Sequence, residues 1–264
     1  MIHEIIRQRK PLIHCITNPI SINQCANAIL AVGARPIMAE HPREVAGITV
    51  TASALMLNLG NITDVRLESM MISAKAAKDA GIPVILDAVG VACSELRRAF
   101  AGEMISQAFP AVIKGNYSEI NAMYNASYKS PGVDADSSLD MAETAKAAAR
   151  LAKSSGAIIL ASGKTDVITD GARTIYVKNG SPQLAGVTGT GCMLGALCAC
   201  FLSVSRDIPA VAAACAVLGI CGELSETEKG PGSFMVNLLD NLSTLKDGDI
   251  RIRLNMEVTE SEKA

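Results

Sequence analysis

A glycine-rich segment late in the chain holds the residues best suited to chemistry. Residues 185–195 read AGVTGTGCMLG, a glycine-rich turn that runs into an apolar stretch. We expect a helix to begin there, leaving the backbone N–H groups of Gly189, Thr190, Gly191 and Cys192 at the positive end of its dipole. Such N–H groups would stabilise the negative charge that develops on a phosphoryl group during transfer.

Two better known phosphate-binding motifs do not fit this segment. Gly186-x4-Gly191 matches the first half of a Walker A motif, but Cys192-Met193 stands where Lys-Ser/Thr is required. A Rossmann fingerprint is excluded, because the segment follows a predicted hairpin and no βαβ unit comes after it. On pattern alone, an ordinary glycine-rich turn stays open as the alternative.

Polar residues lie at or near the ends of the predicted strands. They are Asn18, Asn58, Asp87, Lys114, Asn116 and Ser162. In open parallel sheets, ligands bind at the carboxyl ends of the strands, so these side chains are expected to share one edge. Asp87 taken alone is equally well explained as a helix cap. Six such residues together favour a binding site.

The elements that position these residues follow from alternating apolar and amphipathic runs. The expected strands are 12–17, 36–39, 54–60, 84–90, 111–116 and 157–163. The expected helices start at Asn18-Pro19 and cover 42–53, 64–80, 117–125 and 138–154. This order predicts an α/β fold with three αβα layers and a central, mostly parallel sheet. A β-hairpin with its turn near Asp170-Gly171 precedes the glycine-rich segment, residues 190–246 are mostly helical, and residues 1–264 form a single domain.

The composition excludes several classes of protein. The chain has 264 residues, of which 49% are hydrophobic and 19% charged, with a net charge of −2. It is therefore expected to be globular, with no nucleic-acid partner. The apolar stretches 192–202 and 208–222 are each too short to span a membrane and are predicted to be buried helices. Since no basic and apolar leader opens the sequence, we expect a cytoplasmic protein without a membrane partner.

The eight cysteines give little sign of disulfides or of a metal site. Disulfides are rare in the reducing compartment that we expect. No CxxC pair occurs, and Cys198 and Cys200 flank a single alanine, a poor spacing for a tetrahedral metal site. We predict that seven of the eight are buried small hydrophobic residues and that Cys192 is the exception.

The segment Thr188–Cys192 resembles the anion-hole motif of the ribokinase-like superfamily. A cysteine at position 192, where most of those kinases have an aspartate, is similar to the hydroxyethylthiazole kinase family of thiamine salvage. Further segments match that family in order: Ile16–Ile20 with Asn23 and Asn27, Pro36–Met38, Asn58–Gly60, Lys114–Glu119, Gly132–Asp134 and Gly230–Phe234. The similarity spans about residues 8–246.

The resemblance implies a ribokinase-like kinase that phosphorylates the hydroxyl of 4-methyl-5-(2-hydroxyethyl)thiazole with ATP and Mg²⁺, and a homotrimer with active sites at subunit boundaries. It also implies roles for particular residues. Cys192, Gly189, Thr190 and Gly191 would be catalytic, and Lys114, Asn116 and Ser162 would contact ATP. Met38, Gly189, Asn18 and Ile20 would contact the thiazole, and Asp87 and Glu119 would serve Mg²⁺.

One segment departs from the family pattern. Where the family usually reads Asp-Pro-Val-Gly-x-Gly-Ala, this chain has Asp87-Ala88-Val89-Gly90-Val91-Ala92-Cys93. Loss of the proline frees one backbone torsion and loss of the second glycine restricts another. We expect the metal site to survive because Asp87 is kept, with a changed loop behind it.

Several alternatives stay open. A kinase of hydroxymethylpyrimidine or pyridoxal, or a dehydratase that repairs hydrated nicotinamide cofactors, would normally carry the aspartate. A thiazole- or nucleotide-binding protein without turnover would account for both the missing aspartate and the altered loop. A cysteine-based redox or metal protein is the weakest alternative. For Cys192 itself we expect a weak base, with a thiol pKa lowered by the helix N-terminus, or a residue that only shapes the pocket.

Overall fold

The computed structural model describes residues 2–125, 127–128 and 140–260. The predicted motif Gly132–Asp134 lies outside the described residues. One nine-stranded sheet has the order β2-β1-β3-β4-β5-β6-β7-β8-β9. The strands are β1 (Leu12–Ile16), β2 (Arg35–Ile37), β3 (Ala54–Asn58), β4 (Val84–Asp87), β5 (Val112–Asn116), β6 (Ile158–Ser162), β7 (Asp166–Thr169), β8 (Arg173–Val177) and β9 (Met256–Glu260).

The sheet is parallel from β2 to β6 and antiparallel from β6 to β9. β7 and β8 form the hairpin that the sequence predicted, and Gly171 at its turn has a φ of +88°. The side chain of Asp170 closes this turn, because its Oδ1 accepts hydrogen bonds from the N–H groups of Ala172 and Arg173. The α/β fold with a mostly parallel central sheet is therefore confirmed.

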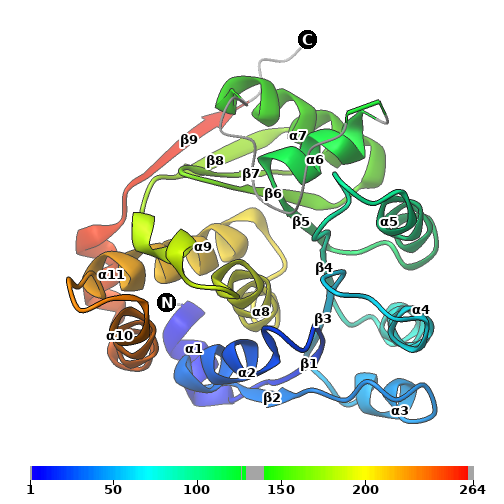
Figure 1. The fold of residues 1–264 in the computed structure, drawn as a ribbon, viewed down its shortest axis with the longest axis horizontal. Coiled ribbons are helices and arrows are strands. Elements are labelled where there is room, and N and C mark those ends of the chain that lie inside the picture. The colour runs from blue at the N-terminus through cyan, green and yellow to red at the C-terminus, as the bar shows by residue number, and fades with distance from the viewer. Residues whose placement is uncertain (1, 126, 129–139, 261–264) are drawn as a thin grey trace.

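Helices cover both faces of the sheet, as Figure 1 shows. The bounds of the helices are α1 (Ile2–Arg9), α2 (Ile22–Ala31), α3 (Val45–Thr49), α4 (Asp64–Asp79), α5 (Glu95–Ala108), α6 (Tyr117–Tyr124), α7 (Met141–Ser155), α8 (Thr190–Leu202), α9 (Ile208–Leu224), α10 (Pro231–Thr244) and α11 (Asp247–Arg253). A short 3₁₀ helix, η1 (Pro182–Gly186), precedes α8.

The two helical layers bury different side chains of the same strands. On one face α8 packs on β1, β3 and β4, and α9 packs on β7 and β8. On the other face α4 packs on β3, and α6 and α7 cover β5 and β6. Within β3 the alternation is clear, since Met56 faces the α8 layer while Leu55 and Leu57 face the α4 layer. Every residue of β3 is buried, as expected for a central strand covered on both sides.

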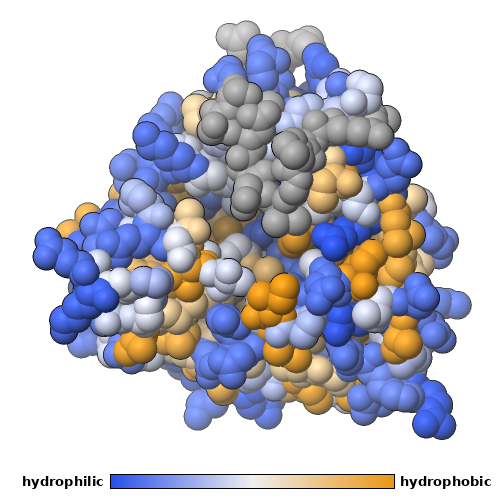
Figure 2. Space-filling view, in the orientation of Figure 1, coloured by the Kyte–Doolittle hydropathy of each residue, from blue (hydrophilic) through white to orange (hydrophobic). Residues whose placement is uncertain are grey.

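The two apolar stretches form the buried helices α8 and α9, as predicted. Within the described residues, no helix is both long and apolar enough to cross a membrane. On the face shown in Figure 2, hydrophobic residues lie in separate groups among hydrophilic ones.

The expected helix start at Asn18-Pro19 is wrong. α2 begins at Ile22, and the side chain of Asn18 instead accepts hydrogen bonds from the N–H groups of Ile20 and Ser21, both at 3.1 Å. This is a turn closed by an asparagine side chain, a conformation that competes with helix capping for the same residue type. The helix expected over 42–53 is also shorter, with α3 confined to Val45–Thr49.

The expectation for the cysteines needs one correction. Six of them are buried, and Cys192 is partly exposed as expected, but Cys93 is exposed. All eight are free thiols. Cys93 lies in the turn between β4 and α5, with an exposed side chain.

Candidate active site

The polar strand ends meet at one edge of the sheet. Asn58 pairs in register with Asp87, Asp87 with Lys114, and Asn116 with Ser162. Because β3, β4, β5 and β6 are parallel, their carboxyl ends coincide. The predicted edge therefore exists, and its side chains are close enough to bond to one another.

A buried ion pair lies at the centre of this edge. Nζ of Lys114 donates to Oδ1 of Asp87 at 2.9 Å, and the two residues are 3% and 0% exposed. Burial alone would lower the pKa of Lys114, but the attraction and hydrogen bond of the Asp87 carboxylate raise it above its usual value. Lys114, predicted to contact ATP, is thus engaged with Asp87 in this structure.

The glycine-rich segment opens α8 as predicted. The first helical hydrogen bond runs from the N–H of Met193 to the carbonyl of Gly189 at 2.8 Å, so the preceding N–H groups have no partner within the helix. Gly189 has a φ of +94°, and a Cβ there would lie 3.3 Å from Cβ of Ser21. Both the left-handed backbone and the close approach to α2 favour glycine.

Thr190 serves this segment through its side chain. Its hydroxyl donates to the carbonyls of Leu184 at 2.8 Å and Val187 at 3.2 Å, which ties the start of α8 to η1. The residue is 9% exposed. What Thr190 offers a ligand is therefore its backbone N–H, while its hydroxyl holds the turn.

Cys192 lies in the first turn of α8 and faces two amide donors. Nδ2 of Asn58 lies 3.4 Å from its Sγ, and Nδ2 of Asn18 lies 3.6 Å from it. Burial, followed by the charge of Asp87, raises the pKa of Cys192, while the charge of Lys114 and hydrogen bonds from Ser21 and Asn18 act in the opposite direction. The net direction is upward, opposite to the lowering that the helix N-terminus led us to expect.

Asn116 and Glu119 form a capping box at the start of α6. The N–H of Glu119 donates to Oδ1 of Asn116 at 2.9 Å, and Oε2 of Glu119 accepts from the N–H of Asn116 at 2.7 Å. The other oxygen, Oε1, accepts from the N–H of Gly90 at 2.7 Å. Burial raises the pKa of Glu119 to about 7, although both backbone hydrogen bonds act to lower it. Glu119 thus holds the altered turn after β4, where Gly90 keeps a φ of +80°.

The remaining predicted residues surround this centre. The hydroxyl of Ser162 donates to the carbonyl of Gly115 at 3.3 Å. Met38 is partly buried and packs against the same apolar cluster as Cys192. Ile20 is 58% exposed. Their contacts with ATP or the thiazole stay predictions.

Two buried polar residues outside the predicted set lie beside the site. Ser21 is 1% exposed and lies against Gly189. His14 is fully buried, with Nε2 2.9 Å from the carbonyl of Ala39 and Nδ1 2.9 Å from Oγ1 of Thr49, and it anchors the segment after Met38. His14 sits within a predicted strand, so a polar residue in a buried strand was the available signal.

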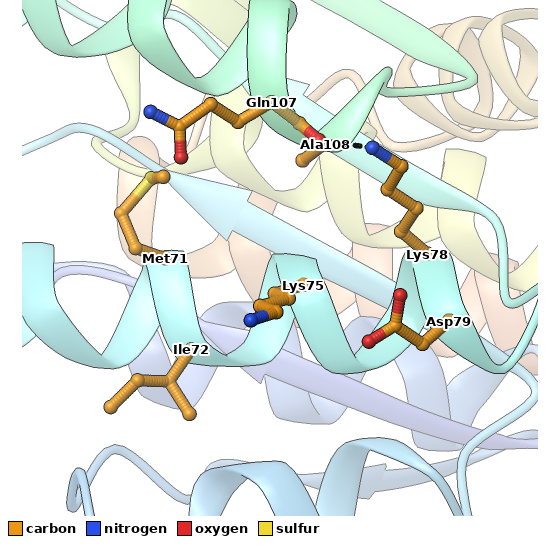
Figure 3. A pocket seen from close by; sticks show the side chains of 7 residues that line it. All are labelled: Met71, Ile72, Lys75, Lys78, Asp79, Gln107 and Ala108. Carbon is orange, nitrogen blue, oxygen red and sulfur yellow. Dashed lines mark hydrogen bonds between the residues drawn. The ribbon is translucent and has the colours of Figure 1, made fainter.

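A separate groove lies between α4 and α5 (Figure 3). It is lined by Met71, Ile72, Lys75, Lys78, Asp79, Gln107 and Ala108. Lys78 reaches across it and donates to the carbonyl of Gln107 at 2.7 Å. Because it shares no residue with the strand-end cluster, this groove is not the candidate active site.

Comparison with solved structures places the fold. The structure of a hydroxyethylthiazole kinase protein from Pyrococcus horikoshii OT3 aligns with a TM-score of 0.90 and 32% identity, covering 98% of each chain. Pyridoxal kinase from Staphylococcus aureus in complex with AMP-PCP and pyridoxal aligns with a TM-score of 0.67, covering 95% of this chain and 99% of that one. At 16% identity the second likeness concerns the fold alone. Fold and site together define a protein of the ribokinase-like class.

Sequence comparison is more specific. Hydroxyethylthiazole kinase 2 of Clostridium botulinum (strain 657 / Type Ba4) is 45% identical over 261 residues, which cover 96% of this chain and 98% of that protein. Hydroxyethylthiazole kinase of Methanosarcina acetivorans is 42% identical over 254 residues, 96% of this chain and 97% of that protein. The model of the hydroxyethylthiazole kinase family matches residues 3–248. The chain belongs to this family.

Proposed function

We propose that this chain transfers the γ-phosphoryl group of ATP to the hydroxyl of 4-methyl-5-(2-hydroxyethyl)thiazole. The products are 4-methyl-5-(2-phosphoethyl)thiazole and ADP, in thiamine biosynthesis or salvage. The proposal treats residues 1–264 as one kinase domain, acting in the cytoplasm. The single observation that carries it is the start of α8, where a cysteine thiol stands beside N–H groups that have no partner within the helix.

Some groups at this edge would bind the phosphoryl group, and others would orient the thiazole substrate. The N–H groups of Gly189 to Cys192 face the charge that develops on the transferred phosphoryl group, where such donors are most effective. Met38, Ile20 and Asn18 would line the thiazole, a small ring that suits an apolar pocket. Because phosphoryl transfer is largely dissociative, positioning and electrostatics carry most of the rate and a strong base is not compulsory.

The raised pKa of Cys192 favours one of the two roles expected for it. A thiol held above its usual pKa is protonated near neutral pH, so it is a poor base there. A protonated thiol also adds no negative charge in front of the helix N-terminus. Cys192 is therefore proposed to shape the pocket and contact the substrate side chain, with proton acceptance as a minor contribution.

The carboxylates of this edge fit Mg²⁺ only as outer partners. All four oxygens of Asp87 and Glu119 already accept hydrogen bonds, from Lys114, Asn58, Gly90 and Asn116. Among the described residues, no three His, Cys, Asp or Glu side chains gather as a metal cage. Mg²⁺ commonly keeps several waters and binds with substrate phosphates, so Asp87 and Glu119 would hold it through water. When bound with ATP, it would neutralise charge on the phosphates.

The homotrimer is part of the same proposal. Exposed apolar side chains on neighbouring helices give the surface that such an assembly would cover: Leu30 of α2 and Val236 of α10 are 55% and 60% exposed. Ile20, in the turn before α2, is 58% exposed. Light scattering coupled to size-exclusion chromatography tests this directly, and a monomeric mass at micromolar concentration would contradict it.

The decisive experiment measures ADP release from the purified chain with Mg-ATP, with and without the thiazole alcohol. Hydroxymethylpyrimidine and pyridoxal serve as matched alcohol controls. Thiazole-dependent ADP release is the expected result. ADP release with one of the other alcohols alone would contradict the substrate while keeping the kinase fold.

A second candidate is a thiazole- or nucleotide-binding protein without turnover. The observation in its favour is that both carboxylates are fully engaged within the protein. Calorimetric binding of the thiazole with no ADP release from any of the three alcohols would decide for this candidate.

A further inference from the structure

We infer that Asn58 is a positioning residue that orients the Cys192 thiol, an inference that rests on the proposed function. Asn58 ends β3, is 0% exposed, and pairs in register with Asp87. It lies behind Cys192, on the strand side of α8, and does not need to touch a substrate to act.

The carboxamide of Asn58 makes its full set of hydrogen bonds. Its Nδ2 donates to Oδ2 of Asp87 at 2.7 Å and to Sγ of Cys192 at 3.4 Å. Its Oδ1 accepts from Nδ2 of Asn18 and from the N–H of Gly60, both at 2.9 Å. An asparagine side chain offers two donors and an oxygen with two lone pairs, so nothing is left over.

These bonds also fix which way the amide points. The backbone N–H of Gly60 can only donate, so the group facing it must be Oδ1, which leaves Nδ2 toward the sulfur. Asn18 is fixed in the same way, because its Oδ1 accepts from the N–H groups of Ile20 and Ser21. Both asparagines therefore present N–H donors to Cys192.

The arrangement limits the directions in which the thiol proton of Cys192 can point. A sulfur that accepts two N–H hydrogen bonds uses its lone pairs toward β3 and Asn18, so its own S–H points to another acceptor, of which the Ser21 hydroxyl is one within the protein. In the proposed reaction, a substrate hydroxyl in front of α8 would be a further hydrogen-bond partner for this thiol. Two amide donors also stabilise the thiolate form of Cys192, which offsets part of the rise in its pKa caused by the Asp87 charge.

Alkylation of the Cys192 thiol by iodoacetamide at one mildly alkaline pH tests this without using kinase activity. Peptide mass spectrometry resolves the rate at Cys192 from that at the exposed Cys93, which is the internal reference. Asn58→Ser is expected to slow alkylation of Cys192 about tenfold relative to Cys93, the size expected for losing one hydrogen bond to an ionised group. A residue that merely fills space would act the other way, because its truncation opens the site and speeds alkylation.

Two further proteins complete the test. Asn58→Thr also removes the amide donor, and its β-branched side chain suits the end of β3, so it covers the case in which Asn58→Ser does not fold. It is expected to slow alkylation of Cys192 as well. Asn179→Ser is the control, because Asn179 is equally a buried and hydrogen-bonded asparagine but bonds to Glu223, Arg253 and Asn255, and it is expected to leave the rate unchanged.

Kinetics supply the second readout. Asn58→Ser is expected to lower kcat about tenfold and to change KM for the thiazole less than about twofold, the pattern of a lost orientation rather than a lost binding contact. Alkylation that is unchanged or faster in the folded variants would overturn the inference. If the unaltered chain shows no thiazole-dependent ADP release but Asn58→Ser still slows alkylation, the proposed function has failed while the orienting contact stands.

Discussion

Breaking the buried ion pair at the strand edge should destabilise the whole protein. At 2.9 Å, the charges of Lys114 and Asp87 attract by about 6 kcal/mol at an effective dielectric constant of about 20. Desolvation of two buried ions offsets much of that gain, but Lys114→Met removes the attraction and leaves Asp87 buried with Asn58 as its remaining side-chain partner. We therefore expect the free energy of unfolding to fall by about 3–5 kcal/mol, and Tm by about 6–20 °C.

Urea unfolding followed by far-UV circular dichroism measures this change, since the chain has no Trp to follow by fluorescence. Lys146→Met is the matched control, because Lys146 and Glu143 form an ion pair of 2.7 Å whose side chains are about two-thirds exposed. Such a pair is screened by solvent, and its loss should not be measurable.

A second substitution separates the charge from the packing. Lys114→Met/Asp87→Asn replaces the carboxylate that has lost its cation by a neutral amide, and it should recover most of the lost stability. A loss of stability in Lys114→Met no larger than in Lys146→Met would contradict a stabilising ion pair, and so would a double variant no more stable than Lys114→Met alone.

Three further outcomes follow from the site and its surroundings. Cys192→Ala should lower kcat by less than about 10³-fold in the thiazole-dependent ADP assay, because a larger loss would match removal of a main base. Gly189→Ala should lower the free energy of unfolding by about 1–2 kcal/mol, as its φ of +94° disfavours a side chain; Gly191→Ala, where a Cβ meets open space, should not, and urea unfolding compares the two. Burial lowers the pKa of His3 to about 4, so between about 6.5 and 4 the unfolded chain binds the proton that the native state refuses. The free energy of unfolding should therefore decrease as the pH is lowered through that window, by at most about 1.4 kcal/mol per pH unit. His3→Gln should flatten this slope in urea titrations at several pH values, and an unchanged slope would contradict the role given to His3.

The strand-end cluster was predictable because it depends on one geometric rule. Buried parallel strands read as apolar runs, and their last residues must share an edge, so Asn58, Asp87 and Lys114 could be grouped before any contact was known. What the rule could not supply is the pairing among them. That Lys114 binds Asp87 rather than facing solvent depends on register between β4 and β5, which is a long-range property.

Other misses have local causes. β9 consists entirely of exposed residues, so its strand depends on hydrogen bonding to β8 rather than on burial. The alternation of apolar and polar residues in this tail is too brief to predict a strand. Asn18-Pro19 carries a helix-start signal, but Asn18 closes a turn with its side chain and α2 starts later. The motif of Asn116 and Glu119, assigned to ATP and Mg²⁺ from the resemblance, is also explained by the fold alone, because the two residues form the capping box of α6.

The cysteine at position 192 is consistent with the charges around it. Asp87 already places one carboxylate behind the start of α8, and Lys114 neutralises it. An aspartate at position 192 would add a second carboxylate a short distance from the first and directly in front of the N–H groups that are proposed to receive a phosphoryl group. A protonated thiol held by Asn18 and Asn58 leaves the positive end of α8 uncompensated. In the proposed reaction these N–H groups would then bind the phosphoryl group without competition from a nearby carboxylate, while Cys192 would accept a proton poorly. A reaction whose rate depends on positioning and electrostatics tolerates a weak base.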